Sequence, residues 1–361
     1  MGASIAFHLA EAGVEGVLLL ERDALASGST SRAAGGVRAT FSDELNVRVA
    51  LRSLDALAAF GERPGWEIDL RRDGYLFLLS REEDLCDFER GADLQRALGA
   101  RTEIVDVERA RRLSPLAGVE GVLAGAFDPL AGIVSPEAVV QGYAAGARSH
   151  GARILTGCPA TRIAATRGRV SAVETPRGEV RTGAVVIAAG VWSRALAEPL
   201  GLPLPVEPLR RRVSYTAPLD GLPEEVPLTI DFESGFYFHR EGRGLLFGSA
   251  HPPGDSQIDW LEHAAPVIER RCPALAQAGI AGGWTGLYEM TPDHNALIGE
   301  ADAPARLLYA TGFSGHGFQM GPAVGEIVRD LYLRRVPFVD VAPLSAARFG
   351  RGAERPERNV V

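Results

Sequence analysis

The spacing of apolar residues along the chain predicts alternating helices and strands, beginning with a helix. Residues 2–11 place large apolar side chains four apart among alanines, which is typical of a helix packed closely on a sheet. Residues 17–20 form an apolar run closed by Glu21, as in a short strand buried on both faces of a parallel sheet. A stretch rich in Ser, Thr and Gly at 27–36 precedes a second helical pattern at 45–60. The chain thus opens inside an α/β unit whose first strand is missing.

Farther along, the periodicity indicates a second kind of structure. An aromatic and aliphatic strand at 75–79 is followed by charged amphipathic helices. Residues 136–150 predict a helix with proline in its first turn. Further strands are predicted at 153–155, 170–173, 185–188, 213–216, 236–240, 245–248 and 307–310. A glycine-rich turn and a helix at 322–333 follow the last of these strands.

These elements predict two interleaved domains. With the strands at 153–155, 170–173 and 185–188 the chain returns to a Rossmann-like α/β domain that contains the parallel sheet, whereas the later alternating strands build an α+β domain on an antiparallel sheet. The expected boundaries assign 1–64, 128–204 and 305–338 to the first domain, 65–127 and 205–304 to the second, and 339–361 to a C-terminal tail. We expect the tail to be disordered beyond Arg348.

Composition narrows the range of partners. The 361 residues carry a formal net charge of −8, which argues against nucleic acid or an anionic membrane as a partner, since both require a basic face. No apolar run approaches the roughly 20 residues of a membrane span. Cys86, Cys158 and Cys272 lie too far apart to suggest a metal cluster or a disulfide framework, and they favour a reducing cytoplasm. A small-molecule substrate fits best.

Gly2 and Glu21 match the end of a dinucleotide-binding signature. Such a fold needs a strand, glycines that let the backbone approach a pyrophosphate, and about 20 residues farther on an acid for the ribose. Gly2 would be the last of these glycines and Glu21 the acid; alternatively, Glu21 is a surface acid at the end of a strand. Because the strand and the first two glycines are absent, we expect Met1 to be an internal methionine of a longer reading frame.

Two later turns favour a nucleotide ligand. Residues 185–193 run from an apolar strand into small residues, where bulky side chains would block a flat or phosphorylated ligand. Residues 307–322 combine a strand, a turn with Gly312, Gly315 and Gly317, and the start of a helix. This arrangement points backbone N–H groups at one place, as anion-binding helix starts do.

Three further segments complete the pattern: 27–38 (SGSTSRAAGGVR), 127–139, and 284–295 (WTGLYEMTPDHN). Together with the glycine turns, and in this order, they resemble the FAD-dependent family that includes D-amino acid oxidase, glycine oxidase, the sarcosine oxidases, dimethylglycine dehydrogenase and the β subunit of dye-linked L-proline dehydrogenase. The similarity covers almost the whole chain. Segment 27–38 resembles the family's flavin loop after its second strand.

The resemblance implies that the first domain holds FAD. The implied contacts, in sequence order, are Gly2, Glu21, Arg22, Ser29, Thr30, Ser31, Ala160, Gly190, Trp192, Gly312, Ser314, Gly315, His316, Gly317, Phe318 and Gln319. N–H groups of the last turn would stabilise negative charge on the reduced flavin. Arg32 and Gly286 stand where relatives carry a flavin-linking histidine or cysteine, so non-covalent FAD is expected.

The resemblance also implies substrate-binding residues. Arg38, at the end of the flavin loop, is expected to bind a substrate carboxylate through its planar guanidinium; alternatively, it forms a surface salt bridge. Tyr237 and His239 share a strand face, and Tyr237, His239 and His251 are candidates to orient or deprotonate the amine. Gln319 replaces the lysine that binds the carboxylate in monomeric sarcosine oxidase, so that contact is not inherited.

The expected activity is hydride transfer from a C–H bond beside the nitrogen of an amino acid or N-methyl amino acid to flavin N5. Sarcosine, glycine, proline and D-amino acids are the substrate types that the resemblance implies. One alternative is a non-catalytic or assembly subunit of a heteromeric flavoenzyme, working with electron-transfer subunits. Another is a truncated fragment that cannot hold FAD.

Leu246 leads to a prediction about the electron acceptor. It falls where monomeric sarcosine oxidase carries a lysine beside the flavin, and leucine cannot stabilise the superoxide that forms in the first electron transfer to oxygen. We expect a dehydrogenase that passes electrons to a quinone, a protein or a dye. Stopped-flow mixing of the reduced enzyme with aerated buffer should show slower reoxidation than mixing with a dye; equal rates would make the enzyme an oxidase.

Overall fold

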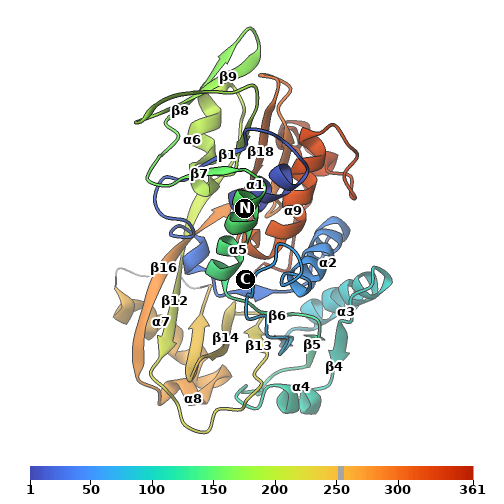
Figure 1. The fold of residues 1–361 in the computed structure, drawn as a ribbon. Coiled ribbons are helices and arrows are strands. Elements are labelled where there is room, and N and C mark those ends of the chain that lie inside the picture. Colours follow the sequence, from blue (N-terminus) through green and yellow to red (C-terminus); the bar gives the residue numbers. More distant parts are fainter. Residues whose placement is uncertain (251–255, 361) are drawn as a thin grey trace.

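The computed structural model describes residues 1–250 and 256–360, and it places them in two halves (Figure 1). The lower half in Figure 1 is built on a large sheet, and the upper half gathers short parallel strands beneath α1, α5 and α9. In the described part of the chain, no helix is long and apolar enough to cross a membrane.

The large sheet has eight strands. Their order is β16 (Ile280–Met290), β12 (Glu207–Thr216), β15 (Gly244–Gly248), β14 (Phe236–Glu241), β13 (Leu228–Asp231), β3 (Tyr75–Leu79), β5 (Ala124–Asp128) and β4 (Glu103–Val105). Neighbouring strands are antiparallel except β13 and β3, which run parallel. One face of the sheet buries phenylalanine and leucine side chains in a core shared with α4 (Val107–Leu113), α7 (Gln257–Arg271) and α8 (Pro273–Ala276). The helix α3 (Glu82–Ala97) connects β3 to β4.

The other half contains two sheets with parallel pairs. Strand β1 (Leu18–Leu20) pairs with β7 (Arg153–Leu155), and β11 (Val185–Ile187) pairs with β18 (Leu307–Thr311). The antiparallel strand β17 (Leu297–Glu300) lies on the other side of β18. One core joins α1 (Gly2–Glu11), α2 (Glu44–Ala58), α5 (Pro136–Ser149) and α9 (Gly317–Tyr332). Short elements complete this half: β2 (Gly36–Val37), paired with β6 (Gly132–Ile133), and α6 (Ser193–Ala197).

The strand predicted at 170–173 is present, but it does not pair with the parallel strands of this half. It is the middle of β9 (Arg169–Thr175), which pairs in antiparallel fashion with β8 (Arg162–Thr166) and β10 (Gly178–Arg181). Positive φ angles at Gly168 and Gly178 reverse the chain at once on both sides. Parallel pairing would require a much longer crossover connection.

Helix α9 begins at Gly317, five residues before the predicted start at Pro322. The glycine-rich run therefore supplies the first turns of the helix as well as the turn before it. Proline removes one backbone donor from the helix. The helix tolerates it here because Pro322 lies near the N-terminus and is packed in the core with Ala323 and Val324.

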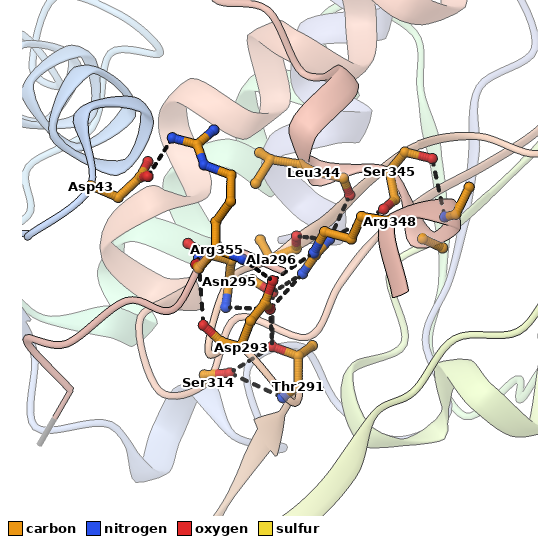
Figure 2. A network of polar contacts seen from close by, with 12 residues as sticks. Asp43, Thr291, Asp293, Asn295, Ala296, Ser314, Leu344, Ser345, Arg348 and Arg355 are labelled. Carbon is orange, nitrogen blue, oxygen red and sulfur yellow. Dashed lines mark hydrogen bonds and ion pairs between the residues drawn. The ribbon is translucent and has the colours of Figure 1, made fainter. Parts of the chain in front are cut away.

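The C-terminal segment is ordered through residue 360, contrary to the disorder expected beyond Arg348. Figure 2 shows Arg348 and Arg355 of this segment around Asp293. Glu357 is only 2% exposed, and its carboxylate accepts hydrogen bonds from the backbone N–H and hydroxyl of Ser42 at 2.9 and 2.7 Å. The sequence pattern gave no sign of this ordered segment, because polar contacts hold it in place and its apolar residues show no periodicity.

The buried ion pair between Arg348 and Asp293 anchors the segment. Two hydrogen bonds of 2.7 and 2.8 Å join the side chains, and Arg348 also donates to the carbonyls of Asn295, Ala296 and Leu344. Burial alone would raise the pKa of Asp293, but the hydrogen bonds and charge of Arg348 lower it below its ordinary value.

Replacing Arg348 should therefore destabilise the fold strongly. Arg348→Met leaves the buried carboxylate of Asp293 without its partner, and we expect a loss of about 3–5 kcal/mol in the free energy of unfolding. Arg358→Met is the control, because its ion pair with Asp87 is exposed and should contribute less than about 1 kcal/mol. Urea denaturation of both variants measures the difference; equal losses would contradict the anchoring role.

Candidate active site

A cavity of about 1290 Å³ runs from α1 and β1 to the large sheet. Its walls come from the start of α1, from β1, from the loop after β1, from β11 and from the first turn of α9. Side chains of β12, β14 and β16 line its far end. The cavity thus joins segments that the sequence associated with a nucleotide to the face of the large sheet that α7 does not cover.

The first arm of the cavity contains the residues expected at the adenosine end. Gly2, Glu21, Arg22, Ala160, Gly190 and Trp192 all line it. The Arg22 guanidinium stacks on the Trp192 ring, with its Cζ 4.0 Å from the ring centroid. One Glu21 carboxylate oxygen accepts from the backbone N–H of Asp23 at 2.9 Å. An acid at one end and an arginine beyond it suit the ribose and pyrophosphate of a dinucleotide.

The loop after β1 is fixed against the free edge of β16. Arg32 donates to the carbonyl of Thr285 at 2.5 Å, and the Ser29 hydroxyl donates to the carbonyl of Leu287 at 3.0 Å. Ser29 and Thr30 line the cavity, whereas Ser31 does not and instead bonds to the carbonyl of Gly28.

The glycine-rich turn divides into residues that shape it and residues that face the cavity. Gly315, His316, Gly317, Phe318 and Gln319 line the cavity. Gly312 and Ser314 do not: the N–H of Gly312 donates to the Glu289 carboxylate at 2.9 Å, and the Ser314 hydroxyl accepts from the N–H of Thr291 at 3.1 Å. The backbone N–H of Ser314 donates to the carbonyl of Glu289 at 3.0 Å, on the same edge of β16. Burial raises the pKa of Glu289.

Three tyrosines and two arginines meet at the far end of the cavity, which we name the tyrosine chamber. Its members are Tyr75, Tyr237, Tyr288, Arg38 and Arg211. Burial raises the pKa of all three phenols, so they stay neutral at physiological pH. In the described part of the chain, their hydroxyls make no hydrogen bond to another residue.

Glycines make room for the three rings. A Cβ atom on Gly36 would lie 1.6 Å from the Tyr75 hydroxyl, and one on Gly248 would lie 2.4 Å from the Tyr237 hydroxyl. A Cβ atom on Gly315 would lie 2.5 Å from the ring of Tyr288. Each glycine comes from a different element, so the chamber forms only when the flavin loop, β15 and the glycine-rich turn pack together.

Of the remaining predicted site residues, some line the cavity and others do not. Gln319 accepts a hydrogen bond from the backbone N–H of Arg38 at 2.8 Å and so ties α9 to the flavin loop. His239 is fully buried and does not line the cavity; burial lowers its pKa to about 4. His316 stacks edge-on against Phe41, and burial lowers its pKa. His251 lies outside the described residues.

Sequence reasoning missed Tyr75, Tyr288 and Arg211. The signal was the two-residue alternation along β12 and β16, which puts Arg211 and Val213 on the face opposite to that of Arg210 and Arg212. Alternation alone does not tell which face of the sheet borders a cavity. Leu246 pairs with Tyr215 and His239 in the sheet and does not line the cavity.

The position of Tyr237 can be tested through Gly248. Gly248→Ala should force the Tyr237 ring to move, because the new methyl group would lie 2.4 Å from its hydroxyl, and such overpacking costs about 1–3 kcal/mol. Gly350→Ala is the control, since no atom lies within 4 Å of its added Cβ. Thermal unfolding should show a lower Tm for the first variant alone; unchanged melting would mean that the ring has room to shift.

Comparisons with known proteins agree with this geometry. A family model described as FAD dependent oxidoreductase matches residues 1–331. The chain is 28% identical to mitochondrial dimethylglycine dehydrogenase of Mus musculus, over 97% of the chain and 43% of that protein. It is 30% identical to FAD-dependent oxidoreductase domain-containing protein 1 of Bos taurus, over 100% of the chain and 85% of that protein. The chain thus spans less than half the length of the dimethylglycine dehydrogenase.

Solved structures of FAD-dependent oxidoreductases also superpose closely on this chain. L-proline dehydrogenase from P. horikoshii superposes with a TM-score of 0.92 at 30% identity, covering 98% of this chain and 96% of that one. Glycine oxidase from Geobacillus kaustophilus has a TM-score of 0.84 at 25% identity, covering 96% and 95%. These matches confirm the predicted α/β class and the resemblance seen in the sequence. The chain belongs to the family of FAD-dependent oxidoreductases.

Proposed function

We propose that the chain binds FAD non-covalently and oxidises the C–N bond of an amino acid or N-methyl amino acid. The observation that carries this proposal is one cavity whose lining runs from α1, β1 and the loop after β1 to the tyrosine chamber. The arm offers Glu21 for a ribose, with Arg22, Ser29 and Thr30 for a pyrophosphate. Bound FAD would supply a two-electron acceptor for the substrate.

A non-covalent cofactor is supported by the residues beside the loop. Arg32 stands in place of a linking histidine, and its guanidinium already donates a hydrogen bond to the carbonyl of Thr285. At Gly286, an added Cβ would lie 3.1 Å from the Arg32 Cβ, so strand β16 and the loop after β1 pack closely there. Neither position offers a side chain that could form a bond to flavin.

The tyrosine chamber suits the oxidation of an amine in two ways. Neutral aromatic rings exclude water from the reacting carbon and leave no charge on the wall that they form. The positive charges of Arg38 and Arg211 disfavour an ammonium ion nearby, and therefore favour the neutral amine that must lose a hydride. The chain's own residues thus bind, orient and hold the substrate in the required protonation state.

The relatives narrow the substrates to be tried. Their names include dimethylglycine and sarcosine dehydrogenases, a 4-methylaminobutanoate oxidase, an L-proline dehydrogenase and a glycine oxidase. The absence of any lysine in the sequence supports a dehydrogenase rather than an oxidase, because no lysine is present to promote the reaction of the flavin with oxygen. A non-catalytic subunit of a heteromeric flavoenzyme is the alternative, because the chain covers less than half of the mitochondrial dimethylglycine and sarcosine dehydrogenases that it matches. The cytoplasmic location stays a prediction.

The proposal predicts a yellow protein whose flavin is bleached by an amine. The purified chain, reconstituted with FAD, should release all flavin on acid precipitation, because no covalent link forms. Under anaerobic conditions, at least one of sarcosine, dimethylglycine, glycine, L-proline and 4-methylaminobutanoate should abolish the absorbance of oxidised flavin. Bound flavin that no amine reduces would favour the non-catalytic alternative, and failure to bind FAD would reject the proposal for this chain.

A further inference from the structure

The two arginines of the tyrosine chamber differ in their hydrogen-bond partners. Arg38 is 4% exposed, and both of its terminal nitrogens are engaged: one donates to the carbonyl of Thr40, and the other to the carbonyl of Asn359 at 2.6 Å. Its Cζ lies 4.4 Å from the centroid of the Phe41 ring. Each terminal nitrogen thus gives one of its N–H groups to a carbonyl of the protein itself, which fixes the orientation of the guanidinium.

The C-terminal segment holds Arg38 in this state. The amide of Asn359 donates to the carbonyl of Thr40 at 3.2 Å, and its backbone N–H donates to Glu357 at 2.9 Å. Glu357 in turn accepts from Asn46 at 2.9 Å, and its own N–H donates to the carbonyl of Asp293 at 3.0 Å. Asp293 belongs to the network drawn in Figure 2, which is fastened by Arg348. Releasing Arg38 would therefore disturb a series of buried hydrogen bonds.

Arg211 has no such partners. Its Nε is buried, and no hydrogen-bond partner for it exists among residues 1–250 and 256–360. Its recorded contact is with the ring of Tyr288, whose centroid lies 5.8 Å from Cζ. Arg211 forms no ion pair with any residue that the structure describes. Acidic partners are not scarce, since the chain has 46 acidic and 38 basic residues. An uncompensated guanidinium that lines a cavity is set to receive an anion.

We propose that Arg211, rather than Arg38, binds the carboxylate of the substrate and so selects amines that carry an acid group. This inference rests on the proposed function and names the specificity-determining residue of that site. The planar fork of Arg211 supplies charge-assisted hydrogen bonds, and the hydroxyls of Tyr237 and Tyr288 lie within electrostatic reach of it. Arg38 acts as the tie between the flavin loop and the C-terminal segment.

The chain offers a matched control in the next residue. Arg212 also has a buried Nε without a partner in the described structure, but it lies on the opposite face of β12 and does not line the cavity. Arg211→Gln and Arg212→Gln thus remove the same charge from adjacent positions. Arg38→Gln tests the competing assignment, which is the one that the sequence favours.

Acetate and acetamide are suitable probes, since they have the same shape and differ in charge. Binding to the FAD-loaded protein is measured by the change in flavin absorption, and KM is compared between the best substrate and its amide. Arg211→Gln should weaken acetate binding by about 30-fold or more and leave acetamide unchanged. Arg212→Gln should affect neither probe, and Arg38→Gln should not change the preference for acetate over acetamide.

Three outcomes would overturn the inference. They are a selective loss of acetate binding in Arg38→Gln but not in Arg211→Gln, equal behaviour of Arg211→Gln and Arg212→Gln, or equal losses of acetate and acetamide in Arg211→Gln. Should Arg211→Gln fail to fold, Arg211→Lys keeps the charge without the fork, and it should weaken acetate alone. Failure of every amine to bleach the flavin would reject the proposed function, whereas the acetate comparison would still decide the role of Arg211.

Discussion

The free edge of β16 is the constraint on which the site depends. Three successive carbonyls along this edge, those of Thr285, Leu287 and Glu289, accept hydrogen bonds from Arg32, Ser29 and the backbone of Ser314. The edge therefore holds the flavin loop and the glycine-rich turn, which are far apart in sequence, at a fixed spacing. An unpaired strand edge normally invites association with another chain, and here the protein covers this part of it with its own loop after β1 and its glycine-rich turn.

The opposite edge of β16 pairs with β12, and the register of that pairing decides what faces the cavity. Arg211 lies opposite Gly286, where no side chain competes for space, and Tyr288 is two residues farther along β16 on the same face. A shift of one residue would turn Arg211 away from the cavity and bring Arg210 or Arg212 toward it. The lining of the tyrosine chamber is thus a property of strand register rather than of any single loop.

Buried charge divides into two kinds. Arg348 with Asp293, and Glu357 with its four donors around the start of α2, are fully paired and fasten the C-terminal segment. Arg211 is uncompensated in the described structure and lines the cavity. A paired buried charge resists change because removing one partner leaves the other stranded. Arg211 is only half-buried, so its unpaired charge costs less than a stranded buried charge, and a ligand of opposite sign would remove that cost.

The sequence by itself determined the α/β class, most of the strands and helices, the segments that line the nucleotide arm and the family. These depend on apolar periodicity and on glycines at turns, which are local properties that can be read along the chain. Only the tertiary structure decided that β9 lies in an antiparallel sheet, that the C-terminal segment is ordered, that Arg38 is held by the carbonyl of Asn359, and that Tyr75, Tyr288 and Arg211 share one chamber. Each of these depends on contacts between residues far apart in sequence. Such contacts follow from sheet register and from the satisfaction of buried polar groups, and neither leaves a periodic signal in the chain.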